Sequence, residues 1–519
     1  MNALLVLYAG NVSEQALESL AGGKSSLSLA LERSSLFPGV TKTVILAGRE
    51  GDFPSPHVER RDSWTVRAML ETIAAHCAGF DLCYFAWADC PFLDPALAAK
   101  LAERHLRYAA EYSYADGWPY GLAPELLSPE TAAILAKILG EDDGGEVKRD
   151  SLFTVIQKDI NAFDIETEIS SVDLRPHRLN LCADSQRNLL LLRRFASDGL
   201  PDTAAVERIV AEKQNTLRTL PAFYPVQVYG GCPQSCAYCP WPQAAGAVTE
   251  KRDYLEAARF ESLLEKIAAF SGDAVIDLSL WGEIALHPQK MELIEMVLNR
   301  SELALVVETS GIGWKDSELE RAAELAGKAA AARRKIPLPP LSWIISLDSA
   351  DPAQYREMRG AGFAEANDCA KKLLSLFPKD AYVQAVRTVG AEDDIEKFYR
   401  SWKEAAGNIT ASDGLANVII QKYDDFCGML PRKQASDLSP VQRQPCWHLM
   451  RDMPILLDGT VPLCRQQIAA QGGGVILGNA FTEPLDAIWE RGQRLYNEQC
   501  MKKYDSLCAG CDEYYTYNF

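Results

Sequence analysis

The feature that most constrains the fold is a run of six strand-like segments, separated by helix-like stretches, between residues 226 and 421. The strand-like segments are residues 226–229, 275–280, 304–308, 343–347, 382–387 and 418–421. Parallel strands need such crossover connections, and the crossover helices then cover the outer face of the sheet. We therefore predict an open, partial (βα)6 barrel of parallel strands.

The chain before this barrel shows a second strand–helix alternation. Strand-like runs at residues 3–8, 43–47 and 82–87 alternate with helix-like runs at residues 25–33, 64–77 and 95–108. This pattern predicts another α/β domain. A segment with two prolines, residues 219–225, is a plausible boundary between the two domains. We expect an α/β domain at 1–205, a linker at 206–225, the partial barrel at 226–435 and a small Cys-rich module at 436–519.

Composition limits the classes of function. The 519 residues are 48% hydrophobic and 24% charged, and no apolar run reaches the roughly 18 to 20 residues of a membrane span. We therefore expect no membrane partner. Acidic residues outnumber basic ones by 71 to 53, a formal charge of −18, which argues against a nucleic-acid partner. The first ten residues predict a strand rather than a signal peptide, so we expect a cytoplasmic protein.

The cysteines are unevenly distributed. Of 14 cysteines, Cys232, Cys236 and Cys239 form one cluster, and clustered thiols in a reducing compartment suggest metal rather than disulfides. They directly follow the first barrel strand, at the end where βα barrels build active sites. Three thiolates can hold a [4Fe-4S] cluster and leave one iron open to a substrate or cofactor. The alternatives are a zinc knuckle, which wants a fourth ligand, and three unrelated cysteines.

This CxxxCxxC spacing resembles that of the radical SAM superfamily, and further residues match in order. Trp281-Gly282-Glu283 is similar to the family's GGE element, which binds the amino group of S-adenosylmethionine (SAM), although Trp281 replaces a glycine. The run from Tyr355 to Gly360 also looks familiar. The resemblance implies that Cys232, Cys236 and Cys239 are the catalytic cluster ligands. It implies that SAM is bound by Tyr238, Gly282, Glu283, Ser346 and Asp348. For Glu283 alone, capping of the next helix is the alternative.

The resemblance also implies a reaction and its partners. An electron from a flavodoxin- or ferredoxin-type donor passes through the reduced cluster into the sulfonium of SAM, and a 5′-deoxyadenosyl radical results. This radical abstracts hydrogen from a peptide, protein or small-molecule substrate, so the barrel must exclude water.

The C-terminal module has its own cysteine pattern. Twelve residues separate Cys446 from Gly459, four more precede Cys464, and Cys508-Ala-Gly-Cys511 follows near the end. This pattern resembles SPASM and twitch domains, which carry auxiliary [4Fe-4S] clusters. The resemblance implies one auxiliary cluster held by Cys446, Cys464, Cys508 and Cys511, with Cys500 as an alternative ligand and Cys427 left over. A zinc ribbon with the same four ligands is the alternative. We interpret His448 as a packed polar residue and residues 512–519 as a lid over the cluster.

The first 200 residues resemble sugar-activating nucleotidyltransferases. Gly22-Gly23-Lys24 before a helix is similar to their phosphate-binding loop. Asp89 after an apolar strand and Asp184 after Asn180 resemble their pair of Mg²⁺ ligands. The resemblance implies a nucleotidyltransferase-like (GT-A-like) α/β domain, either catalytic or retained for binding. Asp94 before Pro95 is explained by helix capping alone.

The complete arrangement resembles the spiro-SPASM proteins. Three hypotheses follow. The first is a radical SAM enzyme that modifies a peptide or protein, and the second is an enzyme that oxidises or rearranges a carbohydrate or nucleotide-sugar. The third is a non-catalytic iron-sulfur or electron-transfer scaffold, against which the open iron argues.

Overall fold

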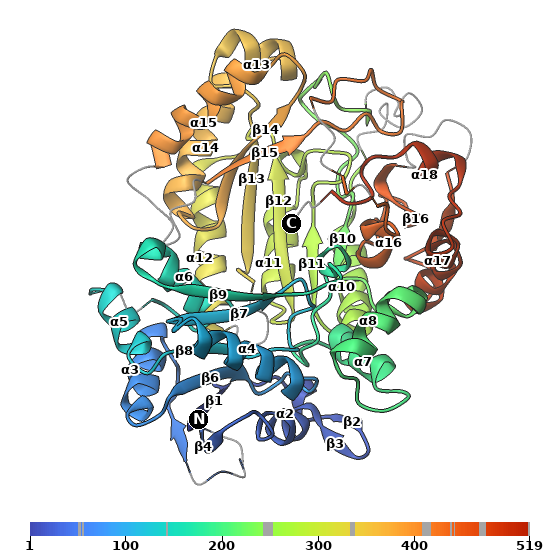
Figure 1. Cartoon of the computed structure of the whole chain (residues 1–519). Helices are drawn as coiled ribbons and strands as arrows, with labels where there is room; N and C mark the ends of the chain where they lie inside the picture. Colours follow the sequence, from blue (N-terminus) through green and yellow to red (C-terminus); the bar gives the residue numbers. More distant parts are fainter. Residues whose placement is uncertain are drawn as a thin grey trace. The chain divides into compact units, whose positions relative to one another are not determined.

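The chain forms two compact units, Met1–Thr219 and Leu220–Phe519, each shown in Figure 1. The computed structural model describes residues 1–49, 53, 55, 57–141, 144–241, 253–332, 338–406, 417–435, 439–440, 442–466 and 474–516. The boundary after Thr219 falls inside the range 206–225 that the sequence predicts as a linker.

The first unit is built on a seven-stranded mixed sheet with the order β5-β4-β1-β6-β8-β7-β9. Its strands, with a small β2–β3 hairpin, are β1 Ala3–Ala9, β2 Ser19–Ala21, β3 Lys24–Ser25, β4 Val40–Ala47, β5 Val58–Arg60, β6 Leu82–Trp87, β7 Tyr112–Asp116, β8 Glu125–Leu127 and β9 Ile165–Ile169. β1 is parallel to β4 and β6, whereas β8 is antiparallel to β6 and β7. Every residue of β1 and β6 is buried, which explains why both strands are uninterrupted apolar runs.

Helices connect these strands, as the alternation predicts. They are α1 Glu14–Leu17, α2 Ser26–Ser34, α3 Val66–Cys77, α4 Pro95–Arg107, α5 Thr131–Ile138, α6 Ser151–Ile156, η1 Gln157–Ala162, η2 Arg175–His177, α7 Gln186–Phe195, α8 Thr203–Glu212 and η3 Gln214–Thr216. Several begin after a Ser, Thr or Asp that accepts a backbone N–H. Before α4, the Asp94 carboxylate accepts the N–H of Ala96 at 2.8 Å, so the predicted cap is confirmed.

The second unit is built on six parallel strands in chain order, β10-β11-β12-β13-β14-β15. With the antiparallel pair β16–β17, the strands are β10 Phe223–Pro225, β11 Ala274–Asp277, β12 Leu303–Thr309, β13 Leu341–Ser346, β14 Ala381–Arg387, β15 Val418–Lys422, β16 Thr460–Pro462 and β17 Ile476–Asn479. The helices are α10 Ala257–Ser271, η5 Ile284–Leu286, α11 Lys290–Leu298, α12 Asp316–Ala332, α13 Pro352–Arg359, α14 Phe363–Leu376, α15 Glu392–Ala406, α16 Trp447–Arg451, α17 Leu485–Cys500 and α18 Ser506–Gly510. The predicted partial barrel is confirmed.

The first barrel strand lies earlier than predicted. The ladder of β10 with β11 covers residues 223–225, whereas the sequence predicts a strand at residues 226–229. The N–H of Val226 still donates to the carbonyl of Asp277 in β11 at 2.7 Å, and Val226 also forms a bridge with Ile455. Farther on, Tyr229 forms a bridge with Tyr254.

The free edge of β10 is covered by a segment of the C-terminal part, residues 452–455. The N–H groups of Met453 and Ile455 donate to the carbonyls of Phe223 and Pro225 at 2.9 and 2.8 Å. The segment runs parallel to β10. Val461, Ile488 and Trp489 of the C-terminal part also belong to the same buried core as the barrel strands. The C-terminal part is therefore continuous with the barrel.

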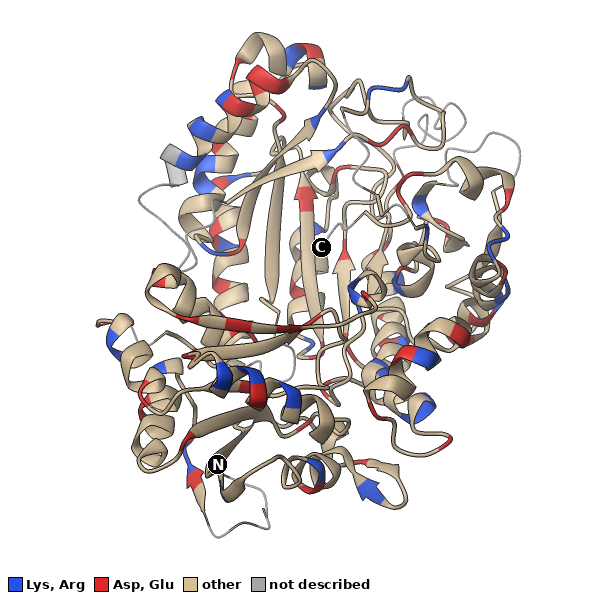
Figure 2. Ribbon diagram, viewed as in Figure 1, with Lys and Arg blue, Asp and Glu red and all other residues tan. Residues whose placement is uncertain are grey.

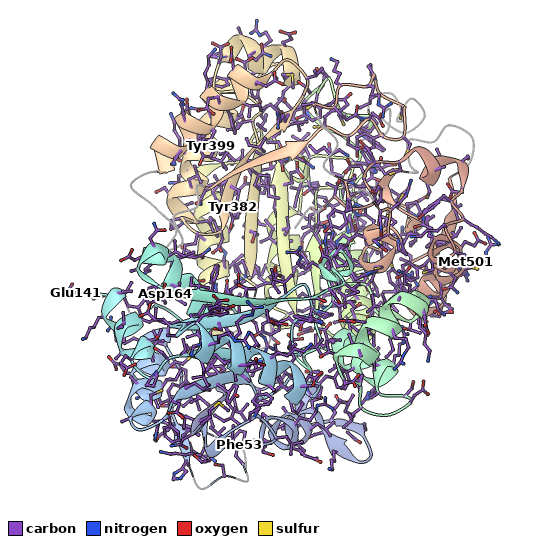
Figure 3. All side chains as sticks on the ribbon, in the orientation of Figure 1. Phe53, Glu141, Asp164, Tyr382, Tyr399 and Met501 are labelled. Atoms are coloured by element: carbon purple, nitrogen blue, oxygen red, sulfur yellow. The ribbon has the colours of Figure 1, made fainter. Side chains whose placement is uncertain are left out.

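The charged residues follow this division into buried strands and surrounding helices. Lys, Arg, Asp and Glu lie mostly on helices and loops, and the strands are largely uncharged (Figure 2). Side chains fill the space around the ribbons, with Tyr382 from β14 and Tyr399 from α15 labelled in Figure 3. Among the described residues, no helix has both the length and the apolar character needed to cross a membrane.

Candidate iron-sulfur and cofactor site

The loop with three cysteines, residues 232–239, follows β10 on the C-terminal side of the parallel sheet. Two backbone hydrogen bonds join it to the end of α13. The N–H of Ser235 donates to the carbonyl of Arg359 at 3.1 Å. The N–H of Ala237 donates to the carbonyl of Met358 at 2.9 Å. We call residues 232–239 the triad loop; its backbone is held independently of its thiols.

The three thiols suit an iron-sulfur cluster with one open iron. Cys232 is exposed, and Cys236 and Cys239 are half-buried. Burial raises the pKa of Cys239 to about 11 and also raises the pKa of Cys236. Without a metal these thiols therefore keep their protons, and a bound cation is what stabilises the thiolates. A [4Fe-4S] cluster has four irons, so three thiolate ligands leave one iron without a protein ligand.

At Gly282, the turn after β11 meets the backbone that directly precedes the triad loop. A Cβ at this position would lie 1.9 Å from the carbonyl oxygen of Tyr229, so only glycine fits. The preceding Trp281 has a φ of +50°, in the left-handed region that favours glycine. Its ring stacks on Trp241 at 6.0 Å between centroids and contacts Phe426 at 5.4 Å. This packing holds Trp281 in a conformation that a glycine would adopt without strain.

Glu283 is buried at the same turn, with 3% of its surface exposed. Its carboxylate accepts the N–H of Ala285 at 3.1 Å and thereby caps η5. It also accepts the hydroxyl of Thr309 and the N–H of Ser310, both at 2.7 Å. Burial raises the pKa of Glu283. The Ser310 hydroxyl also donates to this carboxylate. A carboxylate has about four acceptor positions, so an amino group of a ligand would replace one of these four donors.

Tyr238 and Asp348 are brought together by a residue that the sequence did not single out, Arg359. Its Nη1 donates to Asp348 Oδ2 at 2.8 Å, and both side chains are buried. The Tyr238 hydroxyl donates to the same oxygen and accepts from Arg359. Asp348 Oδ1 accepts the N–H of Val386 at 2.8 Å. Asp348 therefore fixes the ring of Tyr238, and its φ of +65° shows a strained backbone.

Ser346 belongs to a polar layer near the ends of three neighbouring strands. Its hydroxyl donates to Glu308 Oε1 of β12 at 2.8 Å, and Gln384 of β14 donates to the same oxygen at 2.9 Å. Asp277 ends the adjacent β11, and burial raises its pKa to about 7. The sequence motifs do not point to Glu308 or Gln384. The sequence signal that could have revealed them is a polar residue inside an otherwise apolar strand, Glu308 in β12 and Gln384 in β14.

A pocket in the C-terminal part is lined by five cysteines, which are Cys427, Cys446, Cys464, Cys508 and Cys511. Four of them are the predicted auxiliary ligands. The fifth, Cys427, is the one that the pattern left over, and it follows β15 in the chain. Cys500 is at the end of α17 and is not among the described residues that line the pocket.

The pocket thiols differ in their surroundings. Burial raises the pKa of Cys446 and of Cys508. The backbone N–H groups of His448 and Leu449 point to Cys446. Cys427 and Cys511 share a hydrogen bond, which raises the pKa of Cys427 and lowers that of Cys511. Four thiols suffice for a closed [4Fe-4S] cluster, so the donor set fits an auxiliary cluster with one thiol to spare.

His448 also lines this pocket and is 6% exposed. Its Nδ1 lies 2.6 Å from Asp452 Oδ2. Burial alone would raise the pKa of Asp452, but the charges of Arg451 and His448 outweigh burial and lower this pKa to about 2. The ionised carboxylate accepts, so Nδ1 carries the proton. Within the described residues, Nε2 has no hydrogen-bond partner. The sequence predicts that His448 is a packed polar residue; the structure places it on the pocket wall.

In the first unit, Arg149 lies between Asp89 and Asp184. Its Nη1 donates to Asp89 Oδ1 at 2.8 Å, and its Nη2 donates to the other Asp89 oxygen and to Asp184 Oδ2, the latter at 3.3 Å. A guanidinium thus engages the oxygens for which the sequence predicts Mg²⁺, so the pair does not fit a metal in this arrangement. Gly22 and Gly23 have positive φ and form the turn of the exposed β2–β3 hairpin.

Two family models match the chain. The radical SAM superfamily model matches residues 226–400, and an iron-sulfur cluster-binding domain, SPASM, matches residues 446–512. The first match contains the triad loop, and the second contains four of the five pocket cysteines. The sequence leaves open whether the C-terminal cysteines bind an iron-sulfur cluster or the zinc of a zinc ribbon. The match to an iron-sulfur cluster-binding domain supports the cluster.

Similar proteins are found among curated sequences and solved structures. An uncharacterized protein of Treponema pallidum (strain Nichols) is 35% identical over 375 residues, 71% of this chain and 98% of the relative. A second one from this organism is 36% identical over 93 residues, 17% of this chain and 42% of the relative. Streptococcus suis SuiB bound to precursor peptide SuiA is 14% identical and covers 75% of this chain and 84% of that chain, with a TM-score of 0.40. A cytidylyltransferase from Leptospira borgpetersenii is 14% identical and covers 41% of this chain and 94% of that chain, with a TM-score of 0.35.

The parallel half-barrel, the cysteine loop at its C-terminal side and the two family matches agree with one another. A chain with these domains is an enzyme rather than a passive scaffold. It uses a [4Fe-4S] cluster and SAM in the barrel and an auxiliary iron-sulfur cluster in the C-terminal part. The chain belongs to the radical SAM superfamily, with a C-terminal SPASM domain.

Proposed function

We propose that Cys232, Cys236 and Cys239 bind the cluster at which SAM is cleaved. When bound, the cluster and SAM together supply a 5′-deoxyadenosyl radical that removes a hydrogen atom from the substrate. The supporting observation is that the backbone directly before the triad loop contacts the turn at Gly282, where no side chain fits. The N–H of Glu283 donates to the carbonyl of Gly231 at 2.8 Å, and Gly282 lies against Tyr229.

In this proposal the barrel residues each hold one part of SAM. Glu283 would bind the amino group with its carboxylate, and Gly282 would leave room for the methionyl backbone. Tyr238, with its hydroxyl fixed by Asp348, would lie beside the adenine. Ser346, with Glu308, would face the ribose. Arg359 acts as a positioning residue, because its contacts are to Tyr238 and Asp348.

We infer that the substrate is a peptide or protein side chain. The observation that carries this inference is the SPASM match over residues 446–512, since peptides and proteins are the commonest substrates of enzymes with this domain. The barrel and the pocket also contact each other through Phe426. Phe426 precedes Cys427 and packs on Trp281, which precedes Gly282. A substrate held between the two would touch both the SAM turn and the auxiliary pocket.

The test is an anaerobic incubation of the reconstituted protein with SAM, a chemical reductant and fractions of cell extract. We expect the peptide and protein fraction to raise 5′-deoxyadenosine formation above the substrate-free rate and to yield a new peptide mass. A Cys236→Ala variant in the same fraction controls for chemical cleavage of SAM. Stimulation only by a fraction without peptides would contradict the peptide assignment.

A carbohydrate or nucleotide-sugar is the second candidate, and the polar side chains of Gln384 and Asp277, which are not assigned to SAM, favour it. Amide and carboxylate groups are suited to bind the hydroxyl groups of a sugar. Asp277, with a pKa raised to about 7 by burial, offers a group that can exchange a proton near neutral pH. The nucleotide-sugar fraction of the same extract separates this candidate from the first.

The remaining assignments concern partners and organisation. We propose a flavodoxin- or ferredoxin-type electron donor, because the reaction begins with a one-electron reduction. We also propose a reducing compartment such as the cytoplasm, because the five pocket thiols and three triad thiols must remain available to iron. The proposed domains are 1–205, 226–435 and 436–519, with 206–225 as the linker.

A further inference from the structure

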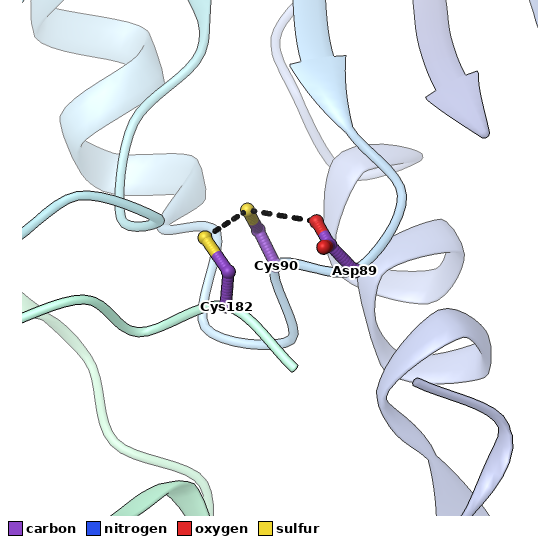
Figure 4. Close-up of side chains that lie close together, drawn as sticks. All are labelled: Asp89, Cys90 and Cys182. Carbon is purple, nitrogen blue, oxygen red and sulfur yellow. Dashed lines mark hydrogen bonds between the residues drawn. The ribbon is translucent and has the colours of Figure 1, made fainter. Parts of the chain in front are cut away.

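Two cysteines of the first unit lie beside the carboxylates that Arg149 joins. Cys90 directly follows Asp89, and Cys182 lies two positions before Asp184. Their sulfur atoms are 3.1 Å apart (Figure 4), although the two residues are 92 positions apart in the chain. The fold therefore brings together two loops that each carry one carboxylate and one thiol.

The backbone holds these loops at a fixed distance. Cys90 lies between β6 and α4, and Cys182 lies shortly before α7. The N–H of Ala183 donates to the carbonyl of Asp89 at 2.9 Å. The N–H of Cys182 donates to the side-chain oxygen of Asn180 at 3.2 Å. The short distance between the thiols is thus set by paired loops and not by side-chain rotation alone.

The surroundings of the pair favour reaction between the two sulfurs. Cys90 is 2% exposed and Cys182 is 0% exposed, so large reagents cannot reach them. Nη1 of Arg149 lies 4.0 Å from Cys90 Sγ, and the Cys90 thiol donates to Asp89 Oδ1 at 3.7 Å, so a carboxylate is in place to accept the thiol proton. The Arg149 side chain is 27% exposed, so a small oxidant can approach from its side.

A metal ion is the other group that such a cluster could hold. Ligand atoms of Asp89, Cys90 and Cys182 all lie within 4.8 Å of one another. However, both oxygens of Asp89 accept hydrogen bonds from Arg149. A cation bound here would lose the carboxylate as a free ligand and would be repelled by the guanidinium. Two thiols without a free third ligand favour oxidation over metal binding.

We propose that Cys90 and Cys182 form a reversible disulfide with a small peroxide as oxidant. The Cys90 sulfur attacks one peroxide oxygen, and the other oxygen leaves with the thiol proton as water, giving a sulfenic acid. The Cys182 thiol then attacks the sulfenic sulfur, and its proton leaves with the sulfenic hydroxyl group as a second water. In sum, two thiols lose two protons and two electrons, and one peroxide becomes two waters. A dithiol reductant reverses the step by thiol–disulfide exchange. The bond ties together the loops that carry Asp89 and Asp184.

Peptide mapping of the full-length protein tests this proposal. Tryptic cleavage after Arg67, Lys100, Arg178 and Arg187 gives peptide 68–100, with Cys77, Cys83 and Cys90, and peptide 179–187, in which Cys182 is the single cysteine. After treatment with hydrogen peroxide and blocking of free thiols, we expect the two peptides to be joined, with two hydrogens lost. A dithiol reductant should release them.

Matched variants identify the sulfur atoms. Cys90→Ser and Cys182→Ser should each abolish the joined peptide, whereas Cys83→Ser, also buried and in the same peptide, should leave it intact. A joined peptide that survives Cys90→Ser would overturn the proposal, as would two free thiols after oxidation of the wild type. Zinc bound at one atom per chain and lost in Cys90→Ser would replace the disulfide by a metal site. Circular dichroism of each variant checks that the unit is folded.

Discussion

The triad loop and the C-terminal pocket differ in how many thiols they offer. The triad loop has three cysteines on eight consecutive residues, whereas five cysteines from separate segments line the pocket. A [4Fe-4S] cluster has four irons, so three thiols leave one iron open and four close the set. The number of thiols thus separates a cluster that can bind SAM from one limited to electron transfer, substrate positioning or folding.

The two regions also differ in what holds them in place. The triad loop is joined to the end of α13 by backbone hydrogen bonds that need no metal. The pocket is assembled from segments that are far apart in the chain, between Cys427 and Cys511. A cluster in the first region uses a preformed loop, whereas a cluster in the second also links the segments together.

The largest effect is expected in the triad loop. Replacing Cys232, Cys236 or Cys239 by Ala leaves two thiols, so we expect loss of reductive SAM cleavage and about four fewer iron atoms per chain. The fold should be retained, because the loop backbone is held independently. 5′-Deoxyadenosine and iron are measured, with Cys369→Ala on α14 as the control. Undiminished 5′-deoxyadenosine in any triad variant would remove that cysteine from the site.

The next effect is expected in the pocket. We expect about eight iron atoms per wild-type chain and about four in Cys508→Ala, because one missing ligand opens a cluster that links distant segments. This variant should still cleave SAM, lose turnover of the true substrate and become more sensitive to proteolysis in its C-terminal part.

Cys500→Ala is the matched control, because Cys500 is outside the pocket lining. If Cys500→Ala loses about four irons and Cys508→Ala does not, the ligand set is wrong. About twelve irons in the wild type would mean a further cluster.

A smaller effect is expected at Glu283. Glu283→Gln removes a charge-assisted contact to the amino group of SAM, worth about 1.5 to 3 kcal/mol, or roughly ten- to a hundredfold in affinity. SAM binding is measured calorimetrically on the reconstituted protein. The cluster should still assemble, so the iron content is the control. An unchanged dissociation constant with a lowered melting temperature would limit Glu283 to its capping of η5.

The smallest effect is expected at Cys427. Its thiol shares a hydrogen bond with Cys511, so in Cys427→Ala we expect all of the iron to remain and only the reduction potential of the auxiliary cluster to change. Potentiometric titration with electron paramagnetic resonance measures this change. Loss of about four irons would instead show that Cys427 is a ligand and that one of the four predicted cysteines does not bind iron.

The features that the sequence predicts well are those set by residues that are close together along the chain. The six strands and the triad spacing are local patterns, and the half-barrel follows from them. The limits of β10 are not local. Its partner beyond β11 is the segment 452–455, more than two hundred positions later in the chain, so the hydrophobic pattern near Val226 could not reveal where the ladder ends.

The site residues that the sequence missed depend on long-range contacts. Arg149 is 60 positions from Asp89, and nothing near either residue indicates the ion pair. Cys427 fits no spacing with the later cysteines, and His448 could be placed on the pocket wall only by the fold. Arg359 lay inside the matched run 355–360, but its contact with Tyr238 spans 121 positions.

The segment 452–455 on the edge of β10 has a consequence for any shortened form of this protein. A chain that ended before the C-terminal part would leave the carbonyl groups of Phe223 and Pro225 and the N–H groups of Ala222 and Gln227 unpaired at the rim of a parallel sheet. Exposed strand edges recruit other chains. Such a fragment would tend to aggregate even with its cysteine loop intact, so insolubility of the isolated barrel would report a missing neighbour strand and not a defective catalytic centre.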